Sequence, residues 1–170
     1  MADQTTKPAP VRRKRPRTPV VAVVPPVVTP PEPALSRGRT APLDPKEADE
    51  LFHSGVALFN GVRYWHAHEA WETLWRAADE EERDFYQGLI QVAAGLLHLQ
   101  RRNVRGARSK LGEGLDKLRP YQPAHRGIFV NELIGKCDRM LQEFEAGQVP
   151  YLIPPAIRFA DVGRPADFDR

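Results

Sequence analysis

The sequence predicts an all-α fold, a single bundle of about five helices that follows a disordered, basic, proline-rich N-terminal tail. From residue 44 onward, apolar residues recur at spacings of three and four, between residues that start and end helices. No strand pattern occurs in that region. Before it, 10 of the 17 prolines lie between Pro8 and Pro42. We therefore expect three parts: a tail (1–43), a helical domain (44–149) and an extended C-terminal tail (150–170).

The N-terminal tail is predicted to be disordered because it shows neither a helical period nor a sustained alternation of apolar residues. It holds eight Lys and Arg residues against two acidic ones, a net charge of 8 − 2 = +6. The rest of the chain holds 17 basic and 20 acidic residues, which gives 17 − 20 = −3. The basic run Arg12–Arg17 could contact nucleic-acid phosphates weakly, through charge alone and without sequence preference.

The first three helices follow from caps and apolar periodicity. A helix is expected over 44–60, where Asp44 can cap the first turn. The second should cover about 63–78 and the third about 80–101, with Asp79 as the cap between them. Apolar residues form a wide stripe on the third helix, which predicts that it is the central and most buried one.

The fourth helix is expected to start at Asn103, a capping residue, and to stop before the prolines that follow it. Gly112 and Gly114 weaken this helix in isolation, so close packing must hold it. A fifth helix is expected over about 130–147. Cys137 lies on its apolar face, which indicates a core residue rather than a reactive thiol.

Several classes of protein are excluded or disfavoured. A single cysteine rules out an intramolecular disulfide and a cysteine-based zinc cage. The longest apolar stretch near the N-terminus, residues 20–24, is too short to cross a membrane. The sequence has no glycine-rich phosphate loop and no nucleophile elbow. We expect a cytoplasmic protein with no membrane partner.

The second helix carries the candidate site. At about 100° per residue, His68 and Glu72 fall on the same face as Tyr64, Trp71 and Trp75. A histidine and a glutamate one turn apart among aromatic rings are partly desolvated, so they need each other or an outside partner. The other polar residues of this helix, Arg76 among them, are expected to point elsewhere.

A polar stripe on the third helix offers a second half of the site. Gln87, Gln91 and His98 lie at helical spacing along it. If the stripe faces the second helix, Gln91 and His98 converge with His68 and Glu72 on one polar pocket. If the stripe faces water, it is an ordinary solvated surface.

Three runs of residues carry a family resemblance: Phe52-x-x-Gly55-x-x-Leu58-Phe59-Asn60, Tyr64-Trp65-x-Ala67-His68-Glu69-x-Trp71-Glu72-x-Leu74-Trp75 and Phe85-Tyr86-Gln87-Gly88-Leu89-Ile90-Gln91-x-Ala93-Ala94. Over about residues 46–146 the chain resembles the small prokaryotic proteins grouped as domain of unknown function family 309. The resemblance implies an all-α fold of about five helices and a bacterial, archaeal or plastid-type source. Some members carry a label of metal-dependent hydrolase. The resemblance points to five candidate functional positions: His68, Glu69, Glu72, Gln91 and His98.

Known metal templates do not fit the sequence. A metalloprotease helix needs His-Glu-x-x-His, whereas a carboxylate, Glu72, stands here in place of the second imidazole. A di-iron bundle needs Glu-x-x-His on two helices, and the single instance, Glu50-x-x-His53, lies on the flank of the first helix.

Two functional hypotheses follow. In the first hypothesis, the domain binds a small ligand or a divalent metal. If the site is catalytic, the domain is a hydrolase. His68 and Glu72 act as acid and base, and with His98 as metal ligands, while the ligand contacts are Gln91, Trp71, Trp75 and Tyr64. In the second, His68 and Glu72 form a buried structural pair. The protein is then a non-catalytic interaction module whose folded part binds a partner and whose tail attracts nucleic acid or an acidic partner.

Overall fold

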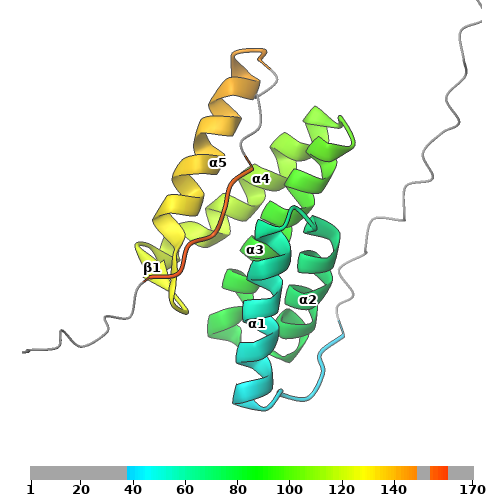
Figure 1. Cartoon of the computed structure of the whole chain (residues 1–170), viewed down its shortest axis with the longest axis vertical. Helices are drawn as coiled ribbons and strands as arrows, with labels where there is room; N and C mark the ends of the chain where they lie inside the picture. The colour runs from blue at the N-terminus through cyan, green and yellow to red at the C-terminus, as the bar shows by residue number, and fades with distance from the viewer. Residues whose placement is uncertain (1–37, 149–153, 161–170) are drawn as a thin grey trace, which may run out of the picture. The chain divides into compact units, whose positions relative to one another are not determined.

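The computed structural model describes residues 38–148 and 154–160, and in this part the chain forms a bundle of five α-helices (Figure 1). The helices are α1 (Pro45–Asn60), α2 (Tyr64–Ala77), α3 (Glu80–Gln100), α4 (Val104–Leu118) and α5 (Val130–Glu145). The prediction of an all-α bundle of about five helices is therefore confirmed. The predicted disorder of residues 1–37 concerns residues outside the described part.

Three of the predicted caps are present. The Asp44 carboxylate accepts backbone N–H bonds in the first turn of α1, and Asp79 accepts one from the first turn of α3. Asn103 accepts from the N–H of Gly106 at the start of α4, at 2.9 Å. Each cap satisfies N–H groups that have no partner inside the helix, which is why the helices begin at these residues.

The connection between α4 and α5 was not predicted. It contains a short 3-10 helix, η1 (Arg119–Tyr121), and a hairpin of β1 (Ala124–His125) with β2 (Ile128–Phe129). Two-residue strands are too short for a period-two pattern to be visible in the sequence. The hairpin turn carries Arg126 with a φ of 44° and Gly127 with a φ of 72°.

Helix α3 is the centre of the bundle, as expected, because it packs against α2 and against α4. The contact with α4 is made at glycines. A Cβ on Gly114 would lie 2.8 Å from the carbonyl oxygen of Gly88, and a Cβ on Gly88 would lie 3.0 Å from that of Gly114. The two helices therefore touch backbone to backbone. The expectation that close packing holds α4 is confirmed at Gly114, whereas a Cβ on Gly112 would have no neighbour within 4 Å.

Helix α1 meets α2 through a similar close approach. A Cβ on Gly55 would lie 2.3 Å from the indole nitrogen of Trp71, so the absence of a side chain makes room for the indole. Trp71 is fully buried, and its ring centroid lies 5.7 Å from that of Phe59. Cys137 of α5 is also fully buried, which confirms that it is a core residue.

The described part of the C-terminal tail, residues 154–160, is fixed to the domain. The side-chain amide of Asn60 donates to the carbonyl of Ile157 at 2.9 Å and accepts from its N–H at 2.8 Å. The N–H of Phe129 donates to the carbonyl of Arg158 at 2.9 Å. This segment thus joins the end of α1 to the hairpin (Figure 1).

Ordered contacts also begin before residue 44. The N–H of Thr40 donates to the carbonyl of Arg76 at 3.1 Å, and Arg39 pairs with Glu80. Leu43 is half-buried against the core. Residues 38–43, which the sequence placed in the disordered tail, therefore pack on the ends of α2 and α3.

None of the helices in residues 38–148 is long and apolar enough to cross a membrane.

The glycine contact between α3 and α4 gives a stability test with a matched control. Gly114→Ala should cost about 1 to 3 kcal/mol of unfolding free energy, because its Cβ meets backbone atoms. Gly112→Ala, two residues away on the same helix, should gain about 0.5 to 1 kcal/mol, because it improves helix propensity in open space. Urea unfolding of both variants measures the difference. Equal effects at the two positions would show that the helices do not touch at Gly114.

Burial of Cys137 predicts a loss of stability in alkali. Burial raises the pKa of its thiol from the ordinary 9.0 to about 12. As the pH rises, the thiol of the unfolded chain loses its proton before the buried thiol of the folded chain does. The contribution of the buried thiol to stability is therefore complete below pH 9 and is lost between pH 9 and about 12. Urea unfolding at rising pH should show the wild type losing stability relative to Cys137→Val above about pH 9. Parallel curves for the two proteins would contradict this account.

Candidate functional site

The predicted acid–base pair on α2 is buried but loosely coupled. The side chains of His68 and Glu72 are 4% and 9% exposed. The His68 Nδ1 atom lies 3.8 Å from Glu72 Oε2, which is beyond hydrogen-bond distance. The ring of Trp65 stacks nearly parallel on that of His68, with centroids 6.2 Å apart. The structure therefore brings the two residues together without a direct hydrogen bond.

The tighter partner of Glu72 is Arg76. The Arg76 Nη2 atom donates to Glu72 Oε1 at 2.5 Å, a charge-assisted hydrogen bond to a buried carboxylate. The expectation that Arg76 points elsewhere was wrong, because its long side chain spans the turn that separates the two residues. The Glu–Arg spacing of four residues is the sequence signal that would have found the pair.

The aromatic residues predicted as ligand contacts are packed in the core. Tyr64 lies edge to face with Phe59, with centroids 5.2 Å apart, and burial raises its pKa to about 12. The guanidinium of Arg83 lies 4.2 Å above the ring of Trp75. Trp71 fills the space beside α1 described above.

Gln91 and His98 make their contacts with α4 and with the turn that precedes it. Gln91 Nε2 donates to Glu113 Oε2 at 3.0 Å, and His98 Nδ1 lies 3.1 Å from Asn103 Nδ2. Among residues 38–148 and 154–160, no three His, Cys, Asp or Glu side chains are grouped so that they could hold a metal ion. Metal binding by His68, Glu72 and His98 therefore stays a prediction from the sequence.

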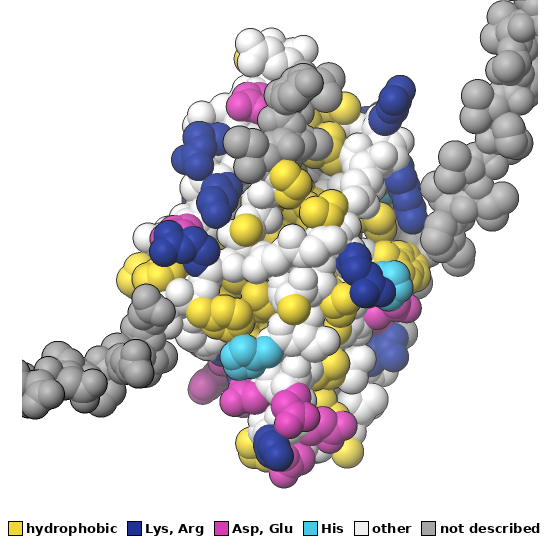
Figure 2. Space-filling model, viewed as in Figure 1, with side chains coloured by type: hydrophobic (Ala, Val, Ile, Leu, Met, Phe, Trp, Pro, Cys, Tyr) yellow, Lys and Arg dark blue, Asp and Glu magenta, His cyan; other side chains and the backbone are white. Residues whose placement is uncertain are grey.

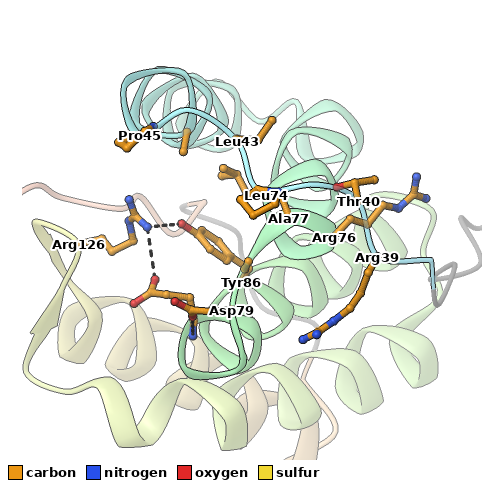
Figure 3. A pocket seen from close by; sticks show the side chains of 14 residues that line it. Arg39, Thr40, Leu43, Pro45, Leu74, Arg76, Ala77, Asp79, Tyr86 and Arg126 are labelled. Atoms are coloured by element: carbon orange, nitrogen blue, oxygen red, sulfur yellow. Dashed lines mark hydrogen bonds and ion pairs between the residues drawn. The ribbon is translucent and has the colours of Figure 1, made fainter.

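A cavity of about 600 Å³ lies beside the end of α2, and we call it the Tyr86 cavity (Figure 3). Residues before α1, the end of α2, the start of α3 and the hairpin contribute to its wall. Its lining residues are Arg39, Thr40, Pro42, Leu43, Pro45, Ala48, Leu74, Arg76, Ala77, Ala78, Asp79, Glu82, Tyr86 and Arg126. Half of these side chains are apolar, and the other half are polar or charged.

The polar wall is organised by Arg126, which points toward Tyr86 in Figure 3. Its Nη1 atom donates to the Tyr86 hydroxyl at 2.5 Å and lies 3.4 Å from a carboxylate oxygen of Glu82. Its Nη2 atom donates to Asp49 on α1 at 3.1 Å. One guanidinium from the hairpin thus joins α1 and α3 at the edge of the cavity.

Tyr86 is a neutral hydrogen-bond donor at this wall. The residue is 2% exposed, and burial raises the pKa of its hydroxyl to about 12. The hydroxyl oxygen accepts from Arg126, and no described residue accepts the hydroxyl proton. A ligand atom that accepts a hydrogen bond can therefore be bound there.

Sequence reasoning missed Tyr86 and Arg126 as functional candidates. Tyr86 was assigned to the apolar stripe of α3, where its ring does pack. Arg126 is 40 residues further along the chain, in a connection with no recognised pattern. No local signal links them, because the two residues meet only through the tertiary fold.

The fold and the cavity define a helical-bundle domain with a partly apolar pocket at one end. Residues 52–109 match the model of the family described as Domain of unknown function (DUF309). This match confirms, over residues 52–109, the resemblance found in the sequence. No curated protein sequence matches the chain.

The Glu72–Arg76 pair predicts a measurable coupling. Arg76→Gln leaves a buried carboxylate without its charged partner and should cost about 1 to 3 kcal/mol of unfolding free energy. The double variant Glu72→Gln, Arg76→Gln removes the charge as well, so it should be more stable than the sum of the single effects predicts. A double-mutant cycle in urea measures this coupling. Strictly additive effects would show that the two side chains act independently.

Proposed function

We propose that the domain binds a small, largely apolar molecule that carries a hydrogen-bond acceptor, such as a carbonyl or carboxylate, in the Tyr86 cavity. The observation that carries the proposal is the Tyr86 hydroxyl, which lies in the cavity wall with its proton not accepted by any described residue. A volume of about 600 Å³ suits a ligand of this kind, since small-molecule sites span roughly 300 to 1,000 Å³.

The lining supports this class of ligand. Leu43, Leu74 and Ala77 provide apolar surface for the body of the molecule. Tyr86 and Arg126 supply hydrogen-bond donors for its acceptor group. The remaining Arg126 donors are shared with carboxylates, which holds the guanidinium in place before a ligand arrives.

The buried pair on α2 is connected to the cavity through Arg76. We propose that Glu72 is a positioning residue, because it holds the side chain of Arg76, a residue that lines the cavity. His68 and Glu72 themselves do not line it. Hydrolysis and metal binding at these two residues stay predictions from the sequence.

The interaction-module hypothesis, in which the N-terminal tail contacts nucleic acid or an acidic partner, also stays a prediction. Its basic run, Arg12–Arg17, lies outside the described residues.

A cavity-filling variant tests the proposal. Ala77 lines the cavity, so Ala77→Phe should abolish saturable binding of anilinonaphthalene sulfonate, an apolar fluorophore with an anionic acceptor group. Ala57 is exposed on α1 and does not line the cavity, so Ala57→Phe is the matched control and should bind as the wild type does. Fluorescence titration measures affinity and stoichiometry, with an expected ratio of about one dye per chain.

Removal of the Tyr86 hydroxyl gives a finer test. Tyr86→Phe keeps the ring and should weaken binding roughly three- to tenfold, the loss expected for one hydrogen bond. Thermal unfolding of the variant separates this loss from a loss of folding. Binding by Ala77→Phe at wild-type strength would place the dye elsewhere and would overturn the proposal.

A further inference from the structure

Charge is divided between the two ends of the helical bundle. The segment that begins α3, residues 79–84, holds five acidic residues and one arginine, and the start of α1, residues 44–50, holds four acidic residues and one lysine. The two starts lie at the same end, since Arg126 bonds both Asp49 and Glu82. Figure 2 shows acidic side chains gathered at the lower end of the face, over the start of α1.

The opposite end is formed by the α1–α2 turn and the α3–α4 turn, and it is basic. The side chain of Gln100 donates to the carbonyl of Val62 at 3.2 Å, which holds the two turns side by side. Residues 51–68 contain no Asp or Glu, and neither do residues 85–112. Four arginines stand at these turns, and we call this set the basic end: Arg63, Arg101, Arg102 and Arg105.

In the described part of the chain, these arginines differ from their neighbours in having no acidic partner. Arg108 pairs with Glu145 at 3.1 Å, and Lys110 pairs with Glu113 at 3.0 Å. Within residues 38–148 and 154–160, no acidic side chain pairs with any of the four residues of the basic end. Three of the four are exposed, and Arg101 is half-buried. The basic end therefore presents uncompensated positive charge to its surroundings.

Helix stability does not explain all of this charge. Cations are favourable near a helix C-terminus, which suits Arg101 and Arg102 at the end of α3. Arg63 and Arg105 stand at the starts of α2 and α4, where a cation is unfavourable. Neither helix has an acidic residue in its first turn to offset them.

We propose that the basic end is a binding surface for the phosphate backbone of nucleic acid, contacted without sequence preference. Clustered arginines without acidic partners release counterions when they meet closely spaced phosphates, which is the source of such binding. An anionic membrane surface fits less well, because stable interfacial binding also needs apolar side chains that insert. Val62 is the one large apolar residue that the described part exposes at this end.

The surface is separate from the Tyr86 cavity, which lies at the acidic end with Asp79 and Glu82 in its wall. Its four arginines are also distinct from the residues of the predicted basic run in the tail, Arg12–Arg17. The nucleic-acid proposal can therefore fail while the ligand proposal holds, and the ligand proposal can fail while the nucleic-acid proposal holds.

The test uses the full chain and a fluorescent DNA duplex of about 20 base pairs, with anisotropy measured from about 50 to 200 mM salt. One variant changes Arg63, Arg101, Arg102 and Arg105 to Gln. The matched control changes the same number of cations away from the basic end, Lys46, Lys117, Arg119 and Arg139, to Gln. Circular dichroism checks that both variants fold. A third protein has Arg12–Arg17 neutralised, so that the contribution of the tail is measured separately.

The basic-end variant should bind more weakly, and its logarithmic salt slope should be shallower than that of the wild type by about 3 to 4, since each lost phosphate contact removes about 0.9. The control should change the slope by less than about 1. Equal slopes for the variant and the wild type, or equal losses in both Gln variants, would overturn the proposal. Loss of binding to phosphatidylserine vesicles without loss of DNA binding would also overturn it, in favour of a membrane surface.

Discussion

The backbone contact between α3 and α4 at Gly88 and Gly114 is the constraint on which the rest of the domain depends. Each glycine places its carbonyl oxygen where a Cβ on the other would stand, so the two helices pack at a separation that a side chain would prevent. This close packing fixes how α4 lies against α3, and therefore where η1 and the hairpin are placed beside α3. The hairpin carries Arg126, so the polar wall of the Tyr86 cavity follows from the helix contact.

Two arginines play corresponding parts in this arrangement. Arg76 pairs with the buried Glu72 within α2, and Arg126 joins the hairpin to Asp49 and Glu82. Both arginines are lining residues of the cavity, and both guanidiniums are held by carboxylates. Because their positions are set by neighbouring charges, the donors that they offer are ordered before a ligand binds, which lowers the entropic cost of binding.

The helices could be predicted closely because their signals are local. Asp44, Asp79 and Asn103 cap the helices that they were expected to cap, and Cys137 lies in the core as its apolar face indicated. The hairpin was not predicted, since strands of two residues carry no periodicity. The packing of residues 38–43 was missed for a related reason, because their contacts with α2 are made by backbone groups and by one leucine.

The candidate site was predicted only in part. The spacing of four residues correctly predicted that His68 and Glu72 lie together, because both are on one helix. It could not decide which neighbour the α3 stripe would face, and Gln91 contacts Glu113 on α4. The juxtaposition of Tyr86 with Arg126 depends on three segments distant in the chain, which no single window of sequence contains.

The central claim is that the Tyr86 cavity holds a small molecule, and methyl NMR spectra of the full chain during titration with decanoate test it most directly. The account predicts saturable shifts confined to methyl groups around the cavity, Leu43, Ala48, Leu74 and Ala77, while methyl groups of Leu111 and Leu133 in the core hold their positions. Shifts spread over the whole domain, or confined to residues that do not line the cavity, would contradict it.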